Sequence, residues 1–397
     1  MPEKYLKMIL NSPVYDVAHE TPLDRAPRLS DKLENNVFIK REDLQPVFSF
    51  KIRGAYNKIV QLSPSEKQRG VIAASAGNHA QGVALAAERL RIKATIVMPE
   101  TTPEIKIDGV KKFGAKVILH GDDFSTAFAK AQEIANENSL VFIPPFDDPF
   151  VIAGQGTIAL ELLRQYTKNI HAIFVPIGGG GLIAGIGSYI KMVRPEIKII
   201  GVESDESASM YASIKKGRRI TLKNVGIFAD GVAVAQVGKE PFRLAKKVVD
   251  EIVLADVDQI CAAVKDLFED TRAIAEPSGA LAVAGMKNYI RDNKISGKTL
   301  IAINCGANVS FDRLRHISER ANYSEAREAL FAVTIPEKKG SFLAFCKVLG
   351  KRSITEFNYR YSSSKEAHIF VGLALTEGKP ERLKIQETFK HHGYETE

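Results

Sequence analysis

The chain has 397 residues, of which 45% are hydrophobic and 26% charged, which is typical of a folded globular protein of two or three domains. The net charge is +8, but basic and acidic residues are interspersed, so we expect no nucleic-acid partner. Three unpaired-looking cysteines, Cys261, Cys305 and Cys346, argue against a disulfide framework and a cysteine-based zinc site. No apolar stretch is long enough to cross a membrane, so we expect a cytoplasmic protein without membrane partners.

Strand-like and helix-like runs alternate through most of the chain. Short apolar strands separated by helices predict α/β architecture with parallel sheets and helices on both faces. Ligands in such folds bind at the C-terminal ends of the strands. The expected strands cover 71–77, 93–99, 115–121, 140–146, 171–181, 198–204, 251–256 and 298–308, and the expected helices include 80–90, 103–113 and 122–138.

The pattern changes near residue 320, after a charged, helix-like linker at 311–328. A β-α-β-β-α-β order follows, which predicts an α+β unit of the ferredoxin-like type. Its expected strands are 329–336, 353–362, 367–375 and 394–397, and its helices are 340–350 and 380–393. The last strand looks cut short at Glu397.

The first motif with chemical content is PVFSFKIRGAYNKIVQL, in which Ser49 is a good helix N-cap and Lys51 falls in the first turn. The helix dipole disfavours a positive charge there. We therefore expect a lowered pKa for Lys51, which favours the neutral amine that a Schiff base requires. The alternative is an ordinary surface lysine.

The second motif is AASAGNHAQGVALAA, where a strand ends in a turn of small residues and a helix begins. Backbone N–H groups at a helix N-terminus suit a carboxylate or a phosphate. Asn78 offers an amide that can bond a phenolic or carbonyl oxygen. His79 is an acid–base candidate by type, but the helix pattern directs it away from the turn, which favours a positional role.

The third motif is VPIGGGGLIAGIG, which places Gly178–Gly181 between a strand and a helix. Backbone N–H groups in such a turn can surround a phosphate. The motif lacks both the Gly-Lys-Ser/Thr of a nucleotide P-loop and the spacing of a dinucleotide fingerprint. A tight turn without a ligand is the alternative.

Three weaker motifs leave alternatives open. Cys305 in INCGANVS is either a core residue or a weak hydrogen-bond partner of a ring nitrogen. Glu276 and Ser278 in EPSGA either cap a helix or contact a substrate. The acids of GVESDES either bind a cation or lie in a solvated loop.

Taken in order, SFKIRGAYNKI, SAGNHAQGVA, PIGGGGL, EPSGA and CGAN resemble the signature of fold-type II pyridoxal-phosphate enzymes of the threonine/serine dehydratase group. KREDLQPVFSFKIRGAY, FAVTIPEKKGSFLAFCKVLG and SITEFNYRY more narrowly resemble the biosynthetic threonine deaminases (threonine ammonia-lyases). The resemblance extends from Thr21 to Tyr394. It implies a two-lobed catalytic domain over 1–320, with a small lobe over about 54–150, and an ACT-like regulatory domain over 328–397.

The resemblance also implies a role for each matching residue. Lys51 is the Schiff-base lysine of pyridoxal 5′-phosphate and the base that takes the α-proton. The other implied cofactor contacts are Phe50, Asn78 at the 3′-oxygen, Gly178, Gly179, Gly180, Gly181 and Leu182 at the phosphate, and Cys305 at the pyridine nitrogen. The substrate carboxylate is expected at Ser75, Ala76, Gly77 and Asn78.

The implied reaction removes water and ammonia from L-threonine to give 2-oxobutanoate, the first step of isoleucine biosynthesis. Isoleucine is the implied feedback inhibitor, and a homotetramer is the implied assembly. Racemisation is not expected, because Ala76 stands where related racemases have serine. Glu203 fits the cation site of that group, but Ser209 stands where relatives have a carboxylate, so no metal is predicted.

Three other functions remain as alternatives. A degradative serine/threonine dehydratase would not require the C-terminal unit. A β-replacement enzyme shares the fold but matches EPSGA and KREDLQPVFSFKIRGAY less well. A non-catalytic amino-acid sensor would need neither Lys51 nor Asn78 nor the glycine run.

Overall fold

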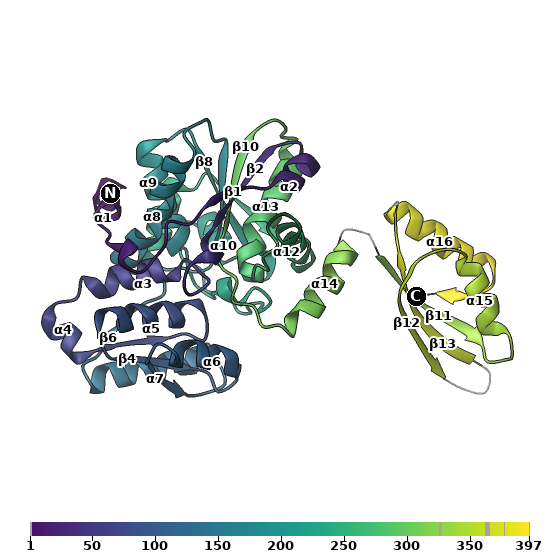
Figure 1. The fold of residues 1–397 in the computed structure, drawn as a ribbon, viewed down its shortest axis with the longest axis horizontal. Coiled ribbons are helices and arrows are strands. Elements are labelled where there is room, and N and C mark those ends of the chain that lie inside the picture. The colour runs from purple at the N-terminus through teal and green to yellow at the C-terminus, as the bar shows by residue number, and fades with distance from the viewer. Residues whose placement is uncertain (1, 325–327, 362–365, 377, 397) are drawn as a thin grey trace. The chain divides into compact units, whose positions relative to one another are not determined.

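The computed structural model describes residues 2–324, 328–361, 366–376 and 378–396. The chain divides into two compact units, Met1–Arg313 and Leu314–Glu397 (Figure 1). Within the described ranges, no helix is both long and apolar enough to span a bilayer.

The larger sheet of the first unit has six strands in the order β1-β2-β10-β7-β8-β9. All neighbouring pairs are parallel except β1 with β2, which is antiparallel. Its strands are β1 (Leu23–Arg25), β2 (Asn36–Arg41), β7 (Ala172–Pro176), β8 (Lys198–Ser204), β9 (Glu251–Ala255) and β10 (Thr299–Asn304).

Helices cover both faces of this sheet, as predicted. Side chains alternate along β7, so Ile173 and Val175 join the core formed with α8 and α9, while the Phe174 ring meets Tyr289 of α13 edge-on at 5.3 Å. The helices around this sheet are α1 (Pro2–Leu10), α2 (Pro27–Leu33), α8 (Pro149–Gln165), α9 (Gly181–Val193), α10 (Ser209–Lys216), α11 (Lys239–Val248), α12 (Val257–Thr271) and α13 (Pro277–Asn293).

The smaller sheet of the first unit is parallel throughout, in the order β5-β4-β3-β6. Along β3, Val71 and Ala73 pack in the core with α3 and α5, whereas Ile72 and Ala74 pack with α7. The elements are α3 (Lys51–Val60), α4 (Pro64–Arg69), β3 (Val71–Ala74), α5 (Asn78–Leu90), β4 (Ala94–Met98), α6 (Glu104–Lys111), β5 (Lys116–Leu119), α7 (Phe124–Glu137) and β6 (Val141–Phe142).

The second unit has the predicted β-α-β-β-α-β order and an antiparallel sheet, β12-β13-β11-β14. Phe331 and Ile369 of the sheet pack with Phe345 and Phe389 of its two helices. The elements are α14 (Arg313–Ser324), β11 (Glu328–Pro336), α15 (Ser341–Leu349), β12 (Ile354–Tyr361), β13 (Glu366–Ala374), α16 (Lys379–His391) and β14 (Glu395–Thr396). Residues 325–327, 362 and 397 of the predicted linker and strands lie outside the described residues.

Two local predictions need correction. The strand β2 was not expected, because its sequence NVFIKR ends in two basic residues. Both are buried: Lys40 bonds Glu161, 121 residues away, and Arg41 bonds Asp43 and Asp24. Ser49 is not a helix cap. Its backbone pairs with Gly306, so α3 starts at Lys51 with Phe50 in the N-cap position and no side-chain cap.

Candidate active site

A pocket is lined by residues that follow strands of both sheets of the first unit, namely β3, β6, β7 and β10. It encloses, with its mouth, about 450 Å³ that protein atoms do not occupy. The predicted residues that line it are Phe50, Lys51, Asn78, Gly178, Gly179, Gly180, Gly181, Leu182 and Cys305. Ser75, Ala76 and Gly77 lie on the adjoining β3–α5 turn and are not among the lining residues that the structure describes.

Lys51 is the first residue of α3, and its Nζ lies 3.1 Å from the carbonyl oxygen of Pro145. Burial lowers the pKa of this amine to about 8, although the nearby Cys305 and Glu276 act in the opposite direction. The predicted lowering of the Lys51 pKa is therefore confirmed. Its main cause is burial, whereas the sequence argument relied on the helix dipole.

The glycine turn permits a close approach of backbone to backbone and to an aromatic ring. A Cβ on Gly179 would overlap the ring of Phe146, and one on Gly178 would lie 2.9 Å from Cα of Val232. Gly180 has φ of 90°, which disfavours other residues. The turn leads directly into α9, so its backbone N–H groups are arranged as in a phosphate site at a helix N-terminus.

Glu276 belongs to the pocket and does not cap a helix with its side chain. It occupies the N-cap position of α13 without a side-chain cap bond, and its carboxylate accepts a 2.7 Å hydrogen bond from Nδ2 of Asn78. Ser278 also lines the pocket and donates to the same carboxylate at 2.6 Å. Of the two roles that the EPSGA motif left open for Glu276, capping of the helix by its side chain is therefore excluded.

Cys305 follows β10 and is buried beside Ser278, whose carbonyl oxygen lies 3.3 Å from Sγ. Burial, reinforced by the charge of Glu276, raises the pKa of this thiol well above its usual range. The thiol is therefore neutral near pH 7. A neutral thiol can form only weak hydrogen bonds with a ring nitrogen.

Two other candidates from the sequence have structural partners. Nε2 of His79 lies 2.8 Å from the carbonyl oxygen of Ile143, and burial lowers the pKa of His79 to about 3. This ring is therefore neutral and serves to bond the backbone at Ile143. Glu203 accepts hydrogen bonds from the backbone N–H groups of Met210 and Tyr211 at the start of α10. Among the described residues, no group of three or more His, Cys, Asp or Glu side chains is arranged to hold a metal ion.

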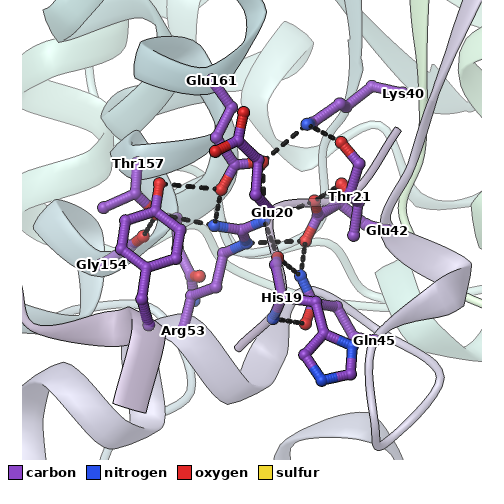
Figure 2. A network of polar contacts seen from close by, with 12 residues as sticks. His19, Glu20, Thr21, Lys40, Glu42, Gln45, Arg53, Gly154, Thr157 and Glu161 are labelled. Atoms are coloured by element: carbon purple, nitrogen blue, oxygen red, sulfur yellow. Dashed lines mark hydrogen bonds and ion pairs between the residues drawn. The ribbon is translucent and has the colours of Figure 1, made fainter. Parts of the chain in front are cut away.

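A network of polar contacts is centred on Arg53 (Figure 2). Arg53 follows Lys51 by two residues on α3 and is completely buried. Its guanidinium donates to Glu42 at 2.7 and 2.8 Å and to Glu161 of α8 at 2.5 and 3.0 Å. Lys40 of β2 completes the network with a 2.6 Å bond to Glu161.

The fully buried charges of this network are two cations, Arg53 and Lys40, and two carboxylates, Glu42 and Glu161, so their formal charges balance. Burial raises the pKa of Glu42, but the charge and hydrogen bonds of Arg53, together with the charge of Lys40 and the hydrogen bond from Thr21, hold the pKa below its usual value. The network joins β2, α3 and α8. It therefore fixes the helix whose first residue is Lys51.

Several lining residues were missed in the sequence. Pro145 and Phe146 are the last two residues of the expected strand at 140–146, and they follow the observed strand β6, so the rule that ligands bind at strand ends could have indicated them. Gln155 lies within α8 and Val232 ends the short 3-10 helix Asp230–Val232, and neither has a local sequence signal.

The residues of the pocket fit pyridoxal phosphate. They combine an amine of lowered pKa, a turn of glycines with no room for side chains, an amide and a neutral thiol. These groups suit an aldehyde, a phosphate, a phenolic oxygen and a ring nitrogen, respectively.

Comparisons with known proteins agree with this chemistry. Residues 14–306 match the family described as pyridoxal-phosphate dependent enzyme, and residues 319–397 match the C-terminal regulatory domain of threonine dehydratase. The biosynthetic L-threonine dehydratase of Burkholderia multivorans is 55% identical over 99% of this chain and 78% of its own length. That of Escherichia coli is 53% identical over 98% of this chain and 76% of its own length.

Solved structures show the same relationship. The processed form of threonine deaminase isoform 2 from Solanum lycopersicum has a TM-score of 0.79 and 52% identity, over 81% of this chain and 93% of that chain. Maize serine racemase has a TM-score of 0.74 and 31% identity, over 78% of this chain and 95% of that chain.

Proposed function

The chain belongs to the pyridoxal-phosphate-dependent enzymes of the threonine dehydratase family, and we propose that it converts L-threonine to 2-oxobutanoate and ammonia. The structural observation that carries this proposal is the position of Lys51, which lines one pocket with Gly178–Gly181, Asn78 and Cys305. A regulatory unit of the threonine dehydratase type follows, which supports the biosynthetic enzyme over a degradative one. The proposed division of labour is catalysis in the unit before residue 313 and regulation in the unit after it.

Pyridoxal phosphate, when bound, supplies an aldehyde that bonds an amine and a ring that absorbs the charge left by a departing α-proton. In our proposal Lys51 holds the aldehyde carbon, and the backbone N–H groups of Gly178–Gly181, together with Leu182, hold the phosphate. Asn78 bonds the 3′-oxygen, Phe50 contacts the cofactor beside Lys51, and Cys305 contacts the ring nitrogen.

Lys51 is also the proposed base. With a pKa of about 8, about a tenth of this amine is neutral near pH 7, far more than for an ordinary lysine. A neutral amine can take the α-proton of threonine without first losing its own proton to water.

The β3–α5 turn is the proposed site for the substrate carboxylate. Its residues, Ser75–Asn78, lead into the 13-residue helix α5, whose first N–H groups favour an anion. A Cβ on Gly77 would meet no atom within 4 Å, so there is space beside this turn.

The assignment of Lys51 can be tested directly. Treating the cofactor-loaded enzyme with sodium borohydride and mapping its peptides by mass spectrometry should place the pyridoxyl group on Lys51. A label on another lysine would contradict the proposed site while leaving the family assignment intact.

The second unit offers a pocket for an effector amino acid, at the turn between β11 and α15. Ile335, Phe342 and Tyr359 give it an apolar part, and the Phe342 and Tyr359 rings lie 6.0 Å apart. Lys338 and Lys339 line its charged part.

We propose that isoleucine binds here as the feedback inhibitor. The aliphatic side chain would pack against the rings, and the carboxylate would meet the lysines. Inhibition requires that isoleucine bind an inactive arrangement of the enzyme more tightly than the active one.

Two further expectations complete the proposal. The assembly is a homotetramer, and exposed apolar side chains on the sheet of the second unit, Leu330 and Phe370, support an interface between copies. Sedimentation velocity should give a single species of four chains, and a monomer would contradict this. The cytoplasm remains the predicted compartment.

A further inference from the structure

A cluster of three side chains connects distant parts of the first unit at the edge of the pocket. Asn78 lies at the start of α5, Glu276 directly precedes α13, and Asn308 follows β10. Their bonds span 198 and 230 residues of sequence. The family chemistry described above uses Asn78 but assigns no role to Glu276 or Asn308.

The hydrogen bonds fix which way the Asn78 amide points. Its Nδ2 donates to Oε1 of Glu276 at 2.7 Å, and its Oδ1 accepts from Nδ2 of Asn308 at 2.5 Å. Turning this amide by 180° would bring its nitrogen against the Asn308 nitrogen and its oxygen against the Glu276 carboxylate. Both contacts would be repulsive, so only one orientation is stable.

Asn308 is itself held in place by three bonds. Its Nδ2 also donates to the carbonyl oxygen of Val47 at 2.9 Å, and its Oδ1 accepts from Gln81 at 3.2 Å. Its backbone N–H donates to Oε2 of Glu276 at 2.9 Å. Asn308 therefore cannot rotate its amide to suit a rotated Asn78 without losing the bond to Val47.

Glu276 has equally little freedom. The side chain is 2% exposed, and Ser278 donates to Oε1 at 2.6 Å. A Cβ on Gly306 would lie 2.8 Å from Oε1, and a Cβ on Gly231 would lie 3.1 Å from it. The carboxylate thus occupies a space bounded by glycines, and each of its oxygens accepts at least one hydrogen bond.

We propose that Glu276 and Asn308 are positioning residues, which hold the Asn78 amide so that the second hydrogen of its nitrogen stays available to the 3′-oxygen of the cofactor. This inference rests on the proposed role of Asn78 as a cofactor ligand. An amide nitrogen carries two hydrogens, and the bond to Glu276 uses one. Without the clamp, the amide could present its oxygen to the cofactor instead.

Glu276→Gln is the first test, because it keeps the shape of the side chain but replaces one acceptor oxygen with a donor nitrogen. If the new amide nitrogen faces Asn308, it meets the backbone N–H. If it faces Asn78, it meets Nδ2. Either orientation places two donors together: the first repels the Asn308 backbone and so displaces the partner of Asn78 Oδ1, and the second repels the Asn78 amide itself, so the cluster that orients Asn78 is weakened in both.

The readouts are the dissociation constant of pyridoxal phosphate for the cofactor-free enzyme and the visible absorption spectrum of the loaded enzyme. We expect Glu276→Gln to weaken cofactor binding roughly tenfold to hundredfold and to shift the visible band. Asn308→Ala should act in the same direction. Asn288→Ala is a matched control, because the side chain of Asn288 likewise donates two hydrogen bonds, to Leu254 and Gln259, but it does not line the pocket. It should lower the melting temperature without changing cofactor affinity.

A double variant separates positioning from simple stabilisation. In Asn78→Asp/Glu276→Gln, the glutamine nitrogen can donate to the new carboxylate, and its oxygen can accept from Asn308, so the cluster is complementary again. The melting temperature should return close to that of the wild type. Cofactor affinity and spectrum should not recover, because aspartate has no N–H to donate.

The outcomes are distinguishable. Glu276→Gln binding the cofactor within twofold of the wild type, with an unchanged spectrum, would overturn the inference. So would full recovery of cofactor affinity in the double variant, since cofactor binding would then depend on the stability of the cluster and not on an N–H at position 78. A wild type that binds no pyridoxal phosphate would refute the proposed function itself.

Discussion

The buried charge network of Figure 2 makes the sharpest prediction about stability. Glu161→Gln removes one of its two carboxylates but keeps the shape of the side chain. Glu161 accepts bonds from Arg53, Lys40 and Tyr15, so the new amide nitrogen must face donors in either orientation. The variant also leaves the two buried cations with a single carboxylate, Glu42.

Removing one partner from a buried ion pair costs about 3–5 kcal/mol. The 313 residues of the first unit should unfold with an entropy of about 0.66 kcal/mol/K near 60 °C. Dividing the first figure by the second gives a decrease of about 5–8 °C in the melting temperature of this unit. Differential scanning calorimetry of the full chain measures it.

Glu20→Gln is the matched control, because Glu20 pairs with Arg164 at the surface, where an ion pair contributes about 0–1 kcal/mol. Lys40→Met added to Glu161→Gln removes the excess cation and should recover part of the lost stability. If Glu161→Gln lowers the melting temperature no more than Glu20→Gln does, the argument about uncompensated buried charge is wrong.

Three other predictions concern the two pockets. Gly179→Ala should weaken pyridoxal phosphate binding by roughly tenfold or more, because the added methyl group overlaps Phe146. Equilibrium titration measures this affinity, and an unchanged value would show that the glycine turn is not the phosphate site. The rate at which the cofactor-free enzyme takes up pyridoxal phosphate should rise with pH around a midpoint near 8, since the neutral Lys51 amine forms as pH rises through its lowered pKa. Stopped-flow absorbance measures this rate. A pH midpoint of about 10.4, the ordinary pKa of lysine, would contradict the lowered pKa of Lys51. Phe342→Ala should raise the isoleucine concentration needed for half-inhibition by roughly tenfold without changing the turnover of threonine. Leu383→Ala, which removes an exposed side chain of α16, should change neither quantity. Equal effects of the two substitutions would show that the effector does not bind at the β11–α15 turn.

Much of the fold follows from local sequence patterns. The alternating strands and helices predicted parallel sheets, and the β-α-β-β-α-β order predicted the second unit, because both depend on hydrophobic periodicity over short windows. The glycine run and Lys51 were found for a similar reason, since glycines between a strand and a helix are a local signal. The roles of these residues toward cofactor and substrate remain predictions.

Features that depend on distant partners were not predictable in this way. The strand β2 carries Lys40, which is completely buried because Glu161, 121 residues away, bonds its ammonium. The EPSGA motif could not show that Glu276 bonds Asn78, which lies 198 residues earlier. Hydrophobic periodicity carries no information about such pairings, which arise only when the sheets bring the strand ends together.

The central claim is that Lys51 acts in a threonine dehydratase that isoleucine regulates. The most direct test is 2-oxobutanoate release from L-threonine by the cofactor-loaded enzyme, with and without isoleucine, for the wild type and Lys51→Ala. We predict activity in the wild type that isoleucine reduces, and essentially none in Lys51→Ala. No 2-oxobutanoate from the wild type, or equal release by both proteins, would contradict the claim.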